Sequence, residues 1–167
     1  MKAKLKIMIP LLILMVLAAA ALIYTRPLSL SQICDDIDIA KIESLNVTYE
    51  VYSDDEVVQY NINRDDPCFL LITDLIAGQK YRRTIWNIFP QTSKTHILRD
   101  GDFKWELGCV ASDAVLSNGE IVSGTVIHIS NFYGKLEITF AAEGKSWRCT
   151  TADQERWISE IMDTIAA

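Results

Sequence analysis

Residues 45–62, LNVTYEVYSDDEVVQYNI, carry the pattern that decides the fold. In the first half of this stretch, apolar residues stand at every second position and alternate with polar ones, as in a strand with one side in solvent. Residues 53–56 form a polar turn, after which the alternation resumes. The segment 43–63 therefore predicts a β-hairpin. Its inward-facing residues are Leu45, Val47, Tyr49, Val51, Val58, Tyr60 and Ile62.

Strand patterns continue through the second half of the chain. The dipeptide Asn118-Gly119 is a strong hairpin-turn signal, and further turn residues follow at 131–134 and 143–144. The strands predicted around these turns cover residues 81–89, 105–111, 122–129, 136–140 and 147–149. The inward-facing residues of the longest one are Trp105, Leu107, Cys109 and Ala111.

A first helix is predicted between the hairpin and the later strands. Asp66 is suited to the N-cap, Pro67 to the first helical position, and Gly78 to a left-handed residue that ends the helix. We expect this helix to be largely buried. Its broad apolar face consists of Phe69, Leu71, Ile72, Leu75 and Ile76.

A second helix is predicted at the end of the sequence. Residues 151–154 fit a capping box, in which side chains satisfy the first free amide hydrogens. The apolar residues that follow lie on one stripe at helical spacing. They are Trp157, Ile158, Ile161, Met162 and Ile165.

These elements predict an α+β fold. Seven strand candidates with connections mostly too short for crossover helices favour an antiparallel sheet, with both amphipathic helices packed on one face. Residues 42–167 then form one domain, which is long enough to bury a single core. Residues 26–41 are predicted to be a linker, in which Ser29 or Ser31 caps a short helical turn.

The N-terminal sequence predicts a membrane segment. Eighteen uncharged residues, Ile7–Tyr24, follow three lysines within residues 1–6 and precede Arg26. As a helix they span about 27 Å, close to the roughly 30 Å of bilayer hydrocarbon. We expect residues 7–25 to be a transmembrane signal anchor, with the lysines in the cytoplasm and the remainder outside. A cleaved signal peptide is the alternative, because Ala18–Ala21 supplies the small residues that signal peptidase prefers.

The charge of the remaining chain disfavours some partners. After residue 27 there are 12 basic and 22 acidic residues, a net charge of −10. Phosphate backbones and anionic lipid headgroups repel such a domain, so we expect no nucleic-acid partner. The protein sequence also lacks a P-loop, a G-x-G-x-x-G motif and an H-E-x-x-H motif. We therefore predict no cofactor-binding residue.

Four cysteines lie in the part expected to be exported, where disulfides are permitted. Cys109 and Cys149 share the parity of the inward-facing residues of their strands, so we expect one disulfide between them and a second between Cys34 and Cys68. The alternative is four free thiols that pack as small apolar side chains. No C-x-x-C pair occurs, which excludes a compact zinc motif.

One loop contains the residue types of a hydrolytic triad. His96 stands near Ser93, Asp100 and Asp102, which could act as nucleophile and orienting groups. A triad is defined by geometry, however, and no G-x-S-x-G motif accompanies these residues. We interpret the segment as an ordinary exposed loop and predict no catalytic residue.

The other charged clusters have simpler interpretations. His128 is expected on the solvent side of its strand, and Lys80, Arg82 and Arg83 form the one basic cluster. Acidic residues gather at 35–38, 54–56 and 65–66, without the loop that binds calcium, so we predict solvated turns and no metal site.

The function expected from these features is binding. We predict a single-pass, membrane-anchored extracytoplasmic domain, a layout common among bacterial envelope proteins, that binds a protein or envelope component through its sheet face or an edge strand without catalysis. The alternatives are a small hydrolase that acts on cell wall or peptides, with His96 at its centre, and a secreted inhibitor or immunity-type protein if the N-terminal segment is cleaved.

Overall fold

The computed structural model describes residues 2–33, 39–52, 57–88, 102–115, 121–132, 135–140 and 145–167. Only the backbone is described at positions 2–7, 39, 86, 88, 113–115, 122, 132, 140 and 145.

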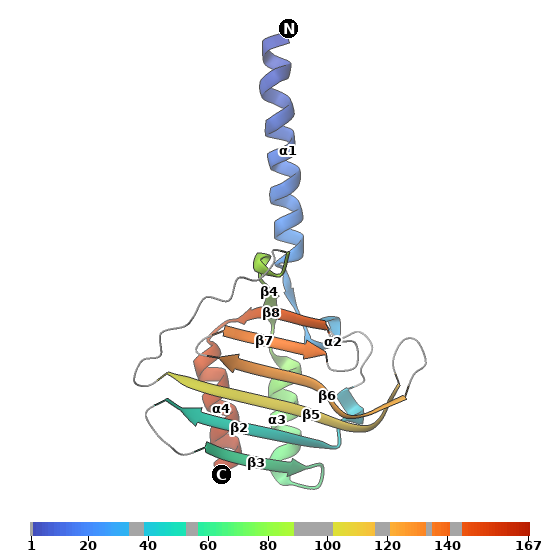
Figure 1. Ribbon diagram of the computed structural model, residues 1–167, viewed down its shortest axis with the longest axis vertical. Helices are drawn as coiled ribbons and strands as arrows, with labels where there is room; N and C mark the ends of the chain where they lie inside the picture. The colour runs from blue at the N-terminus through green and yellow to red at the C-terminus, as the bar shows by residue number, and fades with distance from the viewer. Residues whose placement is uncertain are drawn as a thin grey trace.

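An eight-stranded antiparallel sheet forms the centre of the domain (Figure 1). Its strand order is β1-β4-β8-β7-β6-β5-β2-β3, so β1 and β3 are the two edges. The first four strands in the chain are β1 (Pro27–Leu28), β2 (Ser44–Val51), β3 (Val57–Asn63) and β4 (Tyr81–Arg83). The others are β5 (Phe103–Val115), β6 (Ile121–Phe132), β7 (Lys135–Phe140) and β8 (Lys145–Thr151).

The register of the strands confirms the predicted hairpin and its inward face. Leu45 pairs with Ile62 in β3 and with Cys109 in β5, and all three side chains are buried. The turn at 53–56 lies outside the described residues. On β5, the four residues predicted to face inward are completely buried. Because side chains of equal parity meet across the strands, the core is one continuous apolar face.

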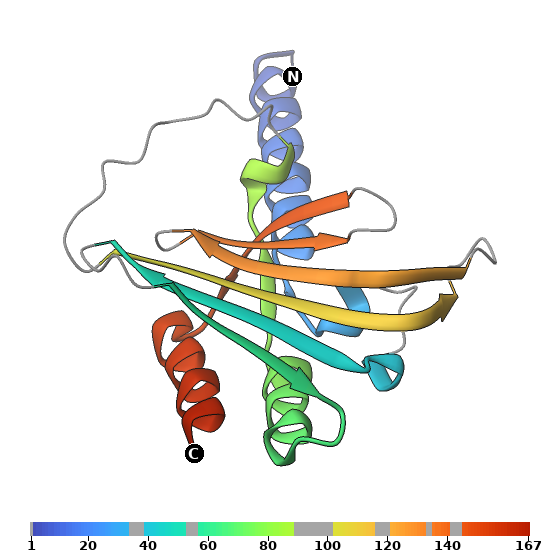
Figure 2. The same ribbon diagram turned by 60° about the horizontal axis from the view of Figure 1, so that its bottom comes forward.

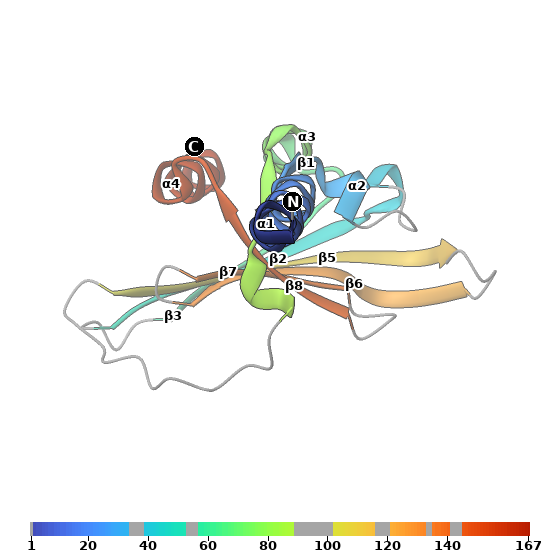
Figure 3. The same ribbon diagram turned by 90° about the horizontal axis from the view of Figure 1, so that it is seen from above.

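Four helices accompany the sheet in the described part of the chain: α1 (Lys2–Tyr24), α2 (Leu30–Ile33), α3 (Pro67–Gly78) and α4 (Gln154–Ala166). Figure 3 shows α3 and α4 on the same face of the sheet. The α+β class, the antiparallel sheet and the two helices on one face are therefore as the sequence predicts.

The α3 helix departs from its prediction at two points. Phe69, Ile72 and Ile76 are buried, but Leu71 is 59% exposed because it points away from the sheet. The helix ends at Gly78 as predicted, but the predicted left-handed conformation of Gly78 is wrong. The next residue, Gln79, is already extended, with φ −68° and ψ 147°, since the chain continues directly into β4.

The α4 helix has the predicted stripe but a different start. Trp157, Ile158 and Ile161 are buried against the core. The predicted capping box is wrong, because the N-cap is Asp153, with φ 55°, and its side chain makes no capping bond. The Gln154 amide instead donates to Asn131 Oδ1 of β6 over 2.6 Å, which ties the helix start to the sheet.

The extended segment predicted at 81–89 ends early. β4 stops at Arg83, and a 3₁₀ turn, η2 (Ile85–Ile88), follows. The Asn87 amide donates to the Arg148 carbonyl over 2.9 Å and its oxygen accepts the Arg148 N–H over 2.8 Å. A side chain thus provides the hydrogen bonds to β8 that a longer strand would have provided.

The segment predicted as a linker contributes to the core. Leu28, Leu30 and Ile33 are at most 8% exposed, and β1 pairs with β4. Ser29 precedes α2, and its N–H donates to the Gln32 side chain over 3.0 Å. A second short 3₁₀ turn, η1 (Ile39–Lys41), leads into β2.

The N-terminal helix α1 extends away from the domain, on the side opposite β3 (Figure 1). Its apolar side chains from Met8 to Leu17 are between 53% and 63% exposed. Among the described residues, no helix has both the length and the apolar character needed to cross a bilayer.

Candidate functional site

A groove of about 660 Å³ runs between α3 and α4 on the outer side of the helix layer. Its apolar part is formed by Leu71, Leu75 and Trp157, and the Trp157 indole N–H donates to the Leu75 carbonyl over 3.3 Å. This bond fixes the two helices side by side where the groove begins.

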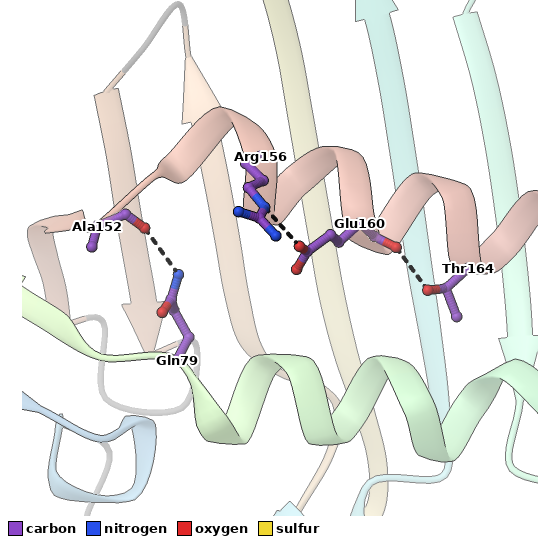
Figure 4. A network of polar contacts seen from close by, with 5 residues as sticks. All are labelled: Gln79, Ala152, Arg156, Glu160 and Thr164. Carbon is purple, nitrogen blue, oxygen red and sulfur yellow. Dashed lines mark hydrogen bonds and ion pairs between the residues drawn. The ribbon is translucent and has the colours of Figure 1, made fainter.

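Polar groups line the rim of the groove (Figure 4). The Gln79 amide donates to the Ala152 carbonyl over 3.5 Å, and Arg156 Nε lies 3.0 Å from Glu160 Oε1. Thr164 donates to the Glu160 carbonyl over 2.7 Å. These polar groups are thus bonded to one another, and the lining residues include no histidine, cysteine or serine. The groove therefore contains no Ser-His or Cys-His pair, although Asp74, Asp153 and Glu160 place carboxylates in its lining.

The described part of the chain does not test the alternative of a hydrolytic triad. Ser93, His96 and Asp100 lie outside the described residues. Asp102 stands just before β5, and its carbonyl accepts the Tyr52 N–H over 2.8 Å. The backbone of Asp102 therefore has a structural role at the end of the hairpin.

His128 lies on the face of β6 opposite Ile127 and Ile129, as predicted. Its neighbours across the sheet are Gly108 of β5 and Thr139 of β7. The side chain is partly exposed on the helix-free face.

Of the three acidic clusters, only the one at residues 65–66 lies in the described part of the chain. Residues 35–38 and 54–56 lie outside the described residues, while Asp66 Oδ2 accepts the Asn63 N–H over 2.6 Å. Within the described ranges, no three His, Cys, Asp or Glu residues lie close enough together to hold a metal ion.

The predicted Cys109–Cys149 disulfide is wrong, because neither cysteine forms a disulfide bond. β5 and β8 are separated by β6 and β7, so their shared face does not bring the two thiols into contact. Cys34 lies outside the described residues, and its proposed partner Cys68 is a free thiol. Burial raises the pKa of Cys149 to about 12, which makes it a poor nucleophile.

The predicted basic cluster is enlarged by the fold. β4, which carries Arg82 and Arg83, pairs with β1 and β8, which bring Arg26 and Arg148 to the same end of the sheet. The Arg83 guanidinium lies 4.3 Å from the centre of the Trp147 ring, a cation–π contact.

The edge strand β3 is a second candidate surface, besides the basic cluster. Its seven residues, VVQYNIN, contain no proline and no charged residue, and its register with β2 is unbroken. Gln59, Asn61 and Asn63 are exposed, and Val57 is 48% exposed. Natural sheets usually protect an edge with lysine, proline, a bulge or a very short strand, and β3 has none of these features.

Comparison with protein families, curated proteins and solved structures finds no match for this chain.

The sequence alone identified neither the full basic cluster nor the β3 edge. The enlarged basic cluster combines three segments far apart in the chain, so only Lys80, Arg82 and Arg83 form a local signal. The composition of residues 57–63 was visible, but the position of β3 at an edge follows from the strand order, which no local pattern encodes.

Proposed function

We propose that the protein is a membrane-anchored extracytoplasmic domain that binds a protein partner, without catalysis, by adding an extended segment of the partner to β3. The observation that carries this proposal is the unprotected edge of β3. An edge strand offers a row of free backbone N–H and C=O groups, and strand addition uses them for affinity.

The anchor is supported by α1. The sequence from Ile7 to Tyr24 is uncharged, and the apolar side chains from Met8 to Leu17 are all more than half exposed. An apolar surface of this size is typical of a membrane or protein contact. This part of the proposal needs its own experiment, because no helix among the described residues meets the requirement for a membrane span.

A second copy in the same bilayer is a poor partner for β3. The helix α1 joins the sheet at β1, and β3 is the opposite edge (Figure 1). Two copies paired through β3 would extend one sheet and direct their N-terminal helices away from each other. We therefore favour a different protein as the source of the added strand.

Charge complementarity favours a basic partner segment. Residues 43–74, which include β2 and β3, contain eight acidic residues and one basic residue. Such a surface attracts a positively charged chain and repels a negatively charged one.

Membrane anchoring is tested on intact cells by protease accessibility and fractionation, together with the N-terminal residue of the mature protein. Retention of residues 7–24 in the membrane fraction, with the domain accessible from outside, is the expected result. A full-length protein that is soluble and shielded from external protease would overturn the anchor.

Strand addition is tested with a photo-crosslinking residue at Gln59 of the full-length protein in its native membrane. The control places the same residue at Thr48, the partner of Gln59 on the interior strand β2. We expect an adduct from Gln59 alone, mapped to a basic extended segment of one protein and weakened by added salt. Equal adducts from both positions, or none from Gln59, would contradict binding at β3.

A further inference from the structure

Charge is divided between the two ends of the sheet. The segments 26–33, 79–88 and 145–151 contain six basic residues and no acidic one, in contrast to the acidic stretch 43–74. The six are Arg26, Lys80, Arg82, Arg83, Lys145 and Arg148. The net charge of −10 therefore conceals a group of segments with the opposite sign.

Strand pairing joins the three basic segments into one surface. Pro27 pairs with Arg82, and Arg82 pairs in turn with Thr150. On the neighbouring position, Arg83 pairs with Cys149. We call this surface, made by β1, β4, η2 and β8, the basic end.

The basic end lies directly at the C-terminal end of α1. Only Thr25 and Arg26 separate α1 from β1, and both the N–H and the hydroxyl of Thr25 donate to the Ala21 carbonyl over 2.9 Å. The turn η2 lies beside the same end of α1 (Figures 1 and 2). The connection is too short for the domain to turn a different surface toward the helix.

Part of the basic end is exposed to solvent. Arg26, Lys80 and Arg82 are exposed, and Ile85 of η2 is 42% exposed. Arginine side chains bind phosphate through several N–H groups, and an exposed isoleucine can enter the interfacial layer between headgroups and acyl chains.

We infer that the basic end docks onto the anionic phospholipid headgroups of the bilayer that holds α1. This inference rests on the anchor proposed above. Each Lys or Arg near an anionic membrane strengthens binding by about five-fold, and the attraction is lost within roughly 10 Å of the surface at 0.1 M salt. Docking therefore holds the β1 edge of the sheet toward the bilayer, and β3 is the strand farthest from the membrane surface.

The experiment is hydrogen exchange on the full-length protein in nanodiscs of phosphatidylglycerol or of phosphatidylcholine. We expect residues 80–88 to exchange at least five-fold more slowly in phosphatidylglycerol, and this difference to disappear at 0.5 M salt, where screening removes it. The double variant Lys80→Glu/Arg82→Glu should also lose the difference. A matched control, Lys41→Glu/Arg64→Glu, makes the same charge change at exposed positions away from the basic end and should keep it.

Exchange of β5 and β6 in each variant reports whether the fold is intact. Equal exchange of residues 80–88 in both lipids would overturn the inference, and so would equal protection by inorganic phosphate in phosphatidylcholine discs. Both outcomes leave the anchor standing if the chain is incorporated into the discs. A chain that is not incorporated contradicts the anchor and this inference together.

Discussion

The two edges of the sheet are built in opposite ways. β1 has two residues, begins with Pro27, which lacks an N–H to donate, and is joined to α1 by Thr25 and Arg26. β3 has seven residues without proline or charge. Short length and proline are devices that keep an edge from pairing with other chains. The comparison teaches that the β1 edge carries two features that hinder pairing with another chain, while the described residues of β3, the edge farthest from α1, carry neither.

The largest expected difference between the two ends is in thiol reactivity. Cys149 lies in β8, two strands from the β1 edge, and Cys68 lies in the first turn of α3, just after β3. With a pKa of about 12, Cys149 carries only about 10⁻⁴ of its thiol as thiolate at pH 8 and is also 2% exposed. We expect N-ethylmaleimide to modify the partly exposed Cys68 at least about a thousand-fold faster, as measured by peptide mass spectrometry. Comparable rates in the folded protein would show that β8 opens readily.

The same thiol predicts an alkaline loss of stability. The pKa of Cys149 is 9.0 in the unfolded chain, and burial raises it to about 12 in the folded protein. The buried neutral thiol therefore contributes its full stabilisation below pH 9, and this stabilisation is lost as the pH rises toward 12. Urea unfolding at several pH values between 8 and 11 measures this loss. In the variant Cys149→Ala, the free energy of unfolding should fall less steeply with pH. An unchanged slope in that variant would assign the loss to other groups.

The next largest effect compares two tyrosines near the two edges. Tyr81 in β4 is fully buried, donates its hydroxyl to the Ile76 carbonyl over 3.0 Å and lies edge-on to Trp157. Tyr60 in β3 is only partly buried. We expect Tyr81→Ala to lower the free energy of unfolding by about 3–5 kcal/mol and Tyr60→Ala by about 1 kcal/mol.

Urea unfolding of the full-length protein in detergent measures both tyrosine variants. Tyr81→Phe is the control that removes the hydroxyl alone, at a cost of about 1 kcal/mol. Equal losses for the two alanine variants would mean that the β3 edge is as firmly packed as the region beside β1.

A smaller effect tests whether the β3 edge is open. Asn61 of β3 and Asn46 of β2 are cross-strand partners, and both are exposed. Asn61→Lys introduces the charge that protects natural edges and repels a basic segment, so crosslinking from Gln59 should fall by about two- to five-fold. Asn46→Lys adds the same charge one strand further in and should leave the yield closer to that of the unmodified protein. The reverse order would place the contact on the sheet face instead.

The smallest expected effect concerns the groove between the helices. The Arg156–Glu160 pair on α4 is well exposed, so Arg156→Ala should lower the free energy of unfolding by about 0.5 kcal/mol or less, and less still in 1 M salt. Thermal unfolding with and without salt measures this change. A loss above about 1 kcal/mol would show that the groove is a stabilising interface and would weaken the emphasis on the edges.

Local patterns predicted the elements whose faces differ in polarity. The alternating apolar residues around Leu45 and Leu107 place one face of each strand against the core. The apolar stripe around Ile161 does the same for one face of the last helix, so sequence and structure agree at these elements. Local patterns failed where long-range contacts decide. The backbone conformations of Gly78 and Asp153 depend on how the chain continues into β4 and α4. β4 ends where the Asn87 side chain bonds to Arg148 of β8, which lies 61 residues later in the sequence.

Strand order explains the remaining misses. The parity of Cys109 and Cys149 correctly placed both thiols on the inner face, but parity says nothing about the two strands between them. Similarly, Pro27 and Leu28 form too short a segment to be recognised as a strand without knowledge of β4. The triad hypothesis remains a prediction, since His96 lies outside the described residues.

The pairing of β1 with β4, and of β4 with β8, has a consequence for the order of folding during synthesis. β2 and β3 can form their hairpin once Asn63 has left the ribosome, because all their mutual contacts are local. The N-terminal strand must wait for Tyr81, and β4 must wait for Thr151, the last residue of β8. Leu28 lacks its strand partner until Tyr81 is made, and β4 lacks β8 until residues 149–151 are made, so the chain completes its sheet at the end where it was begun.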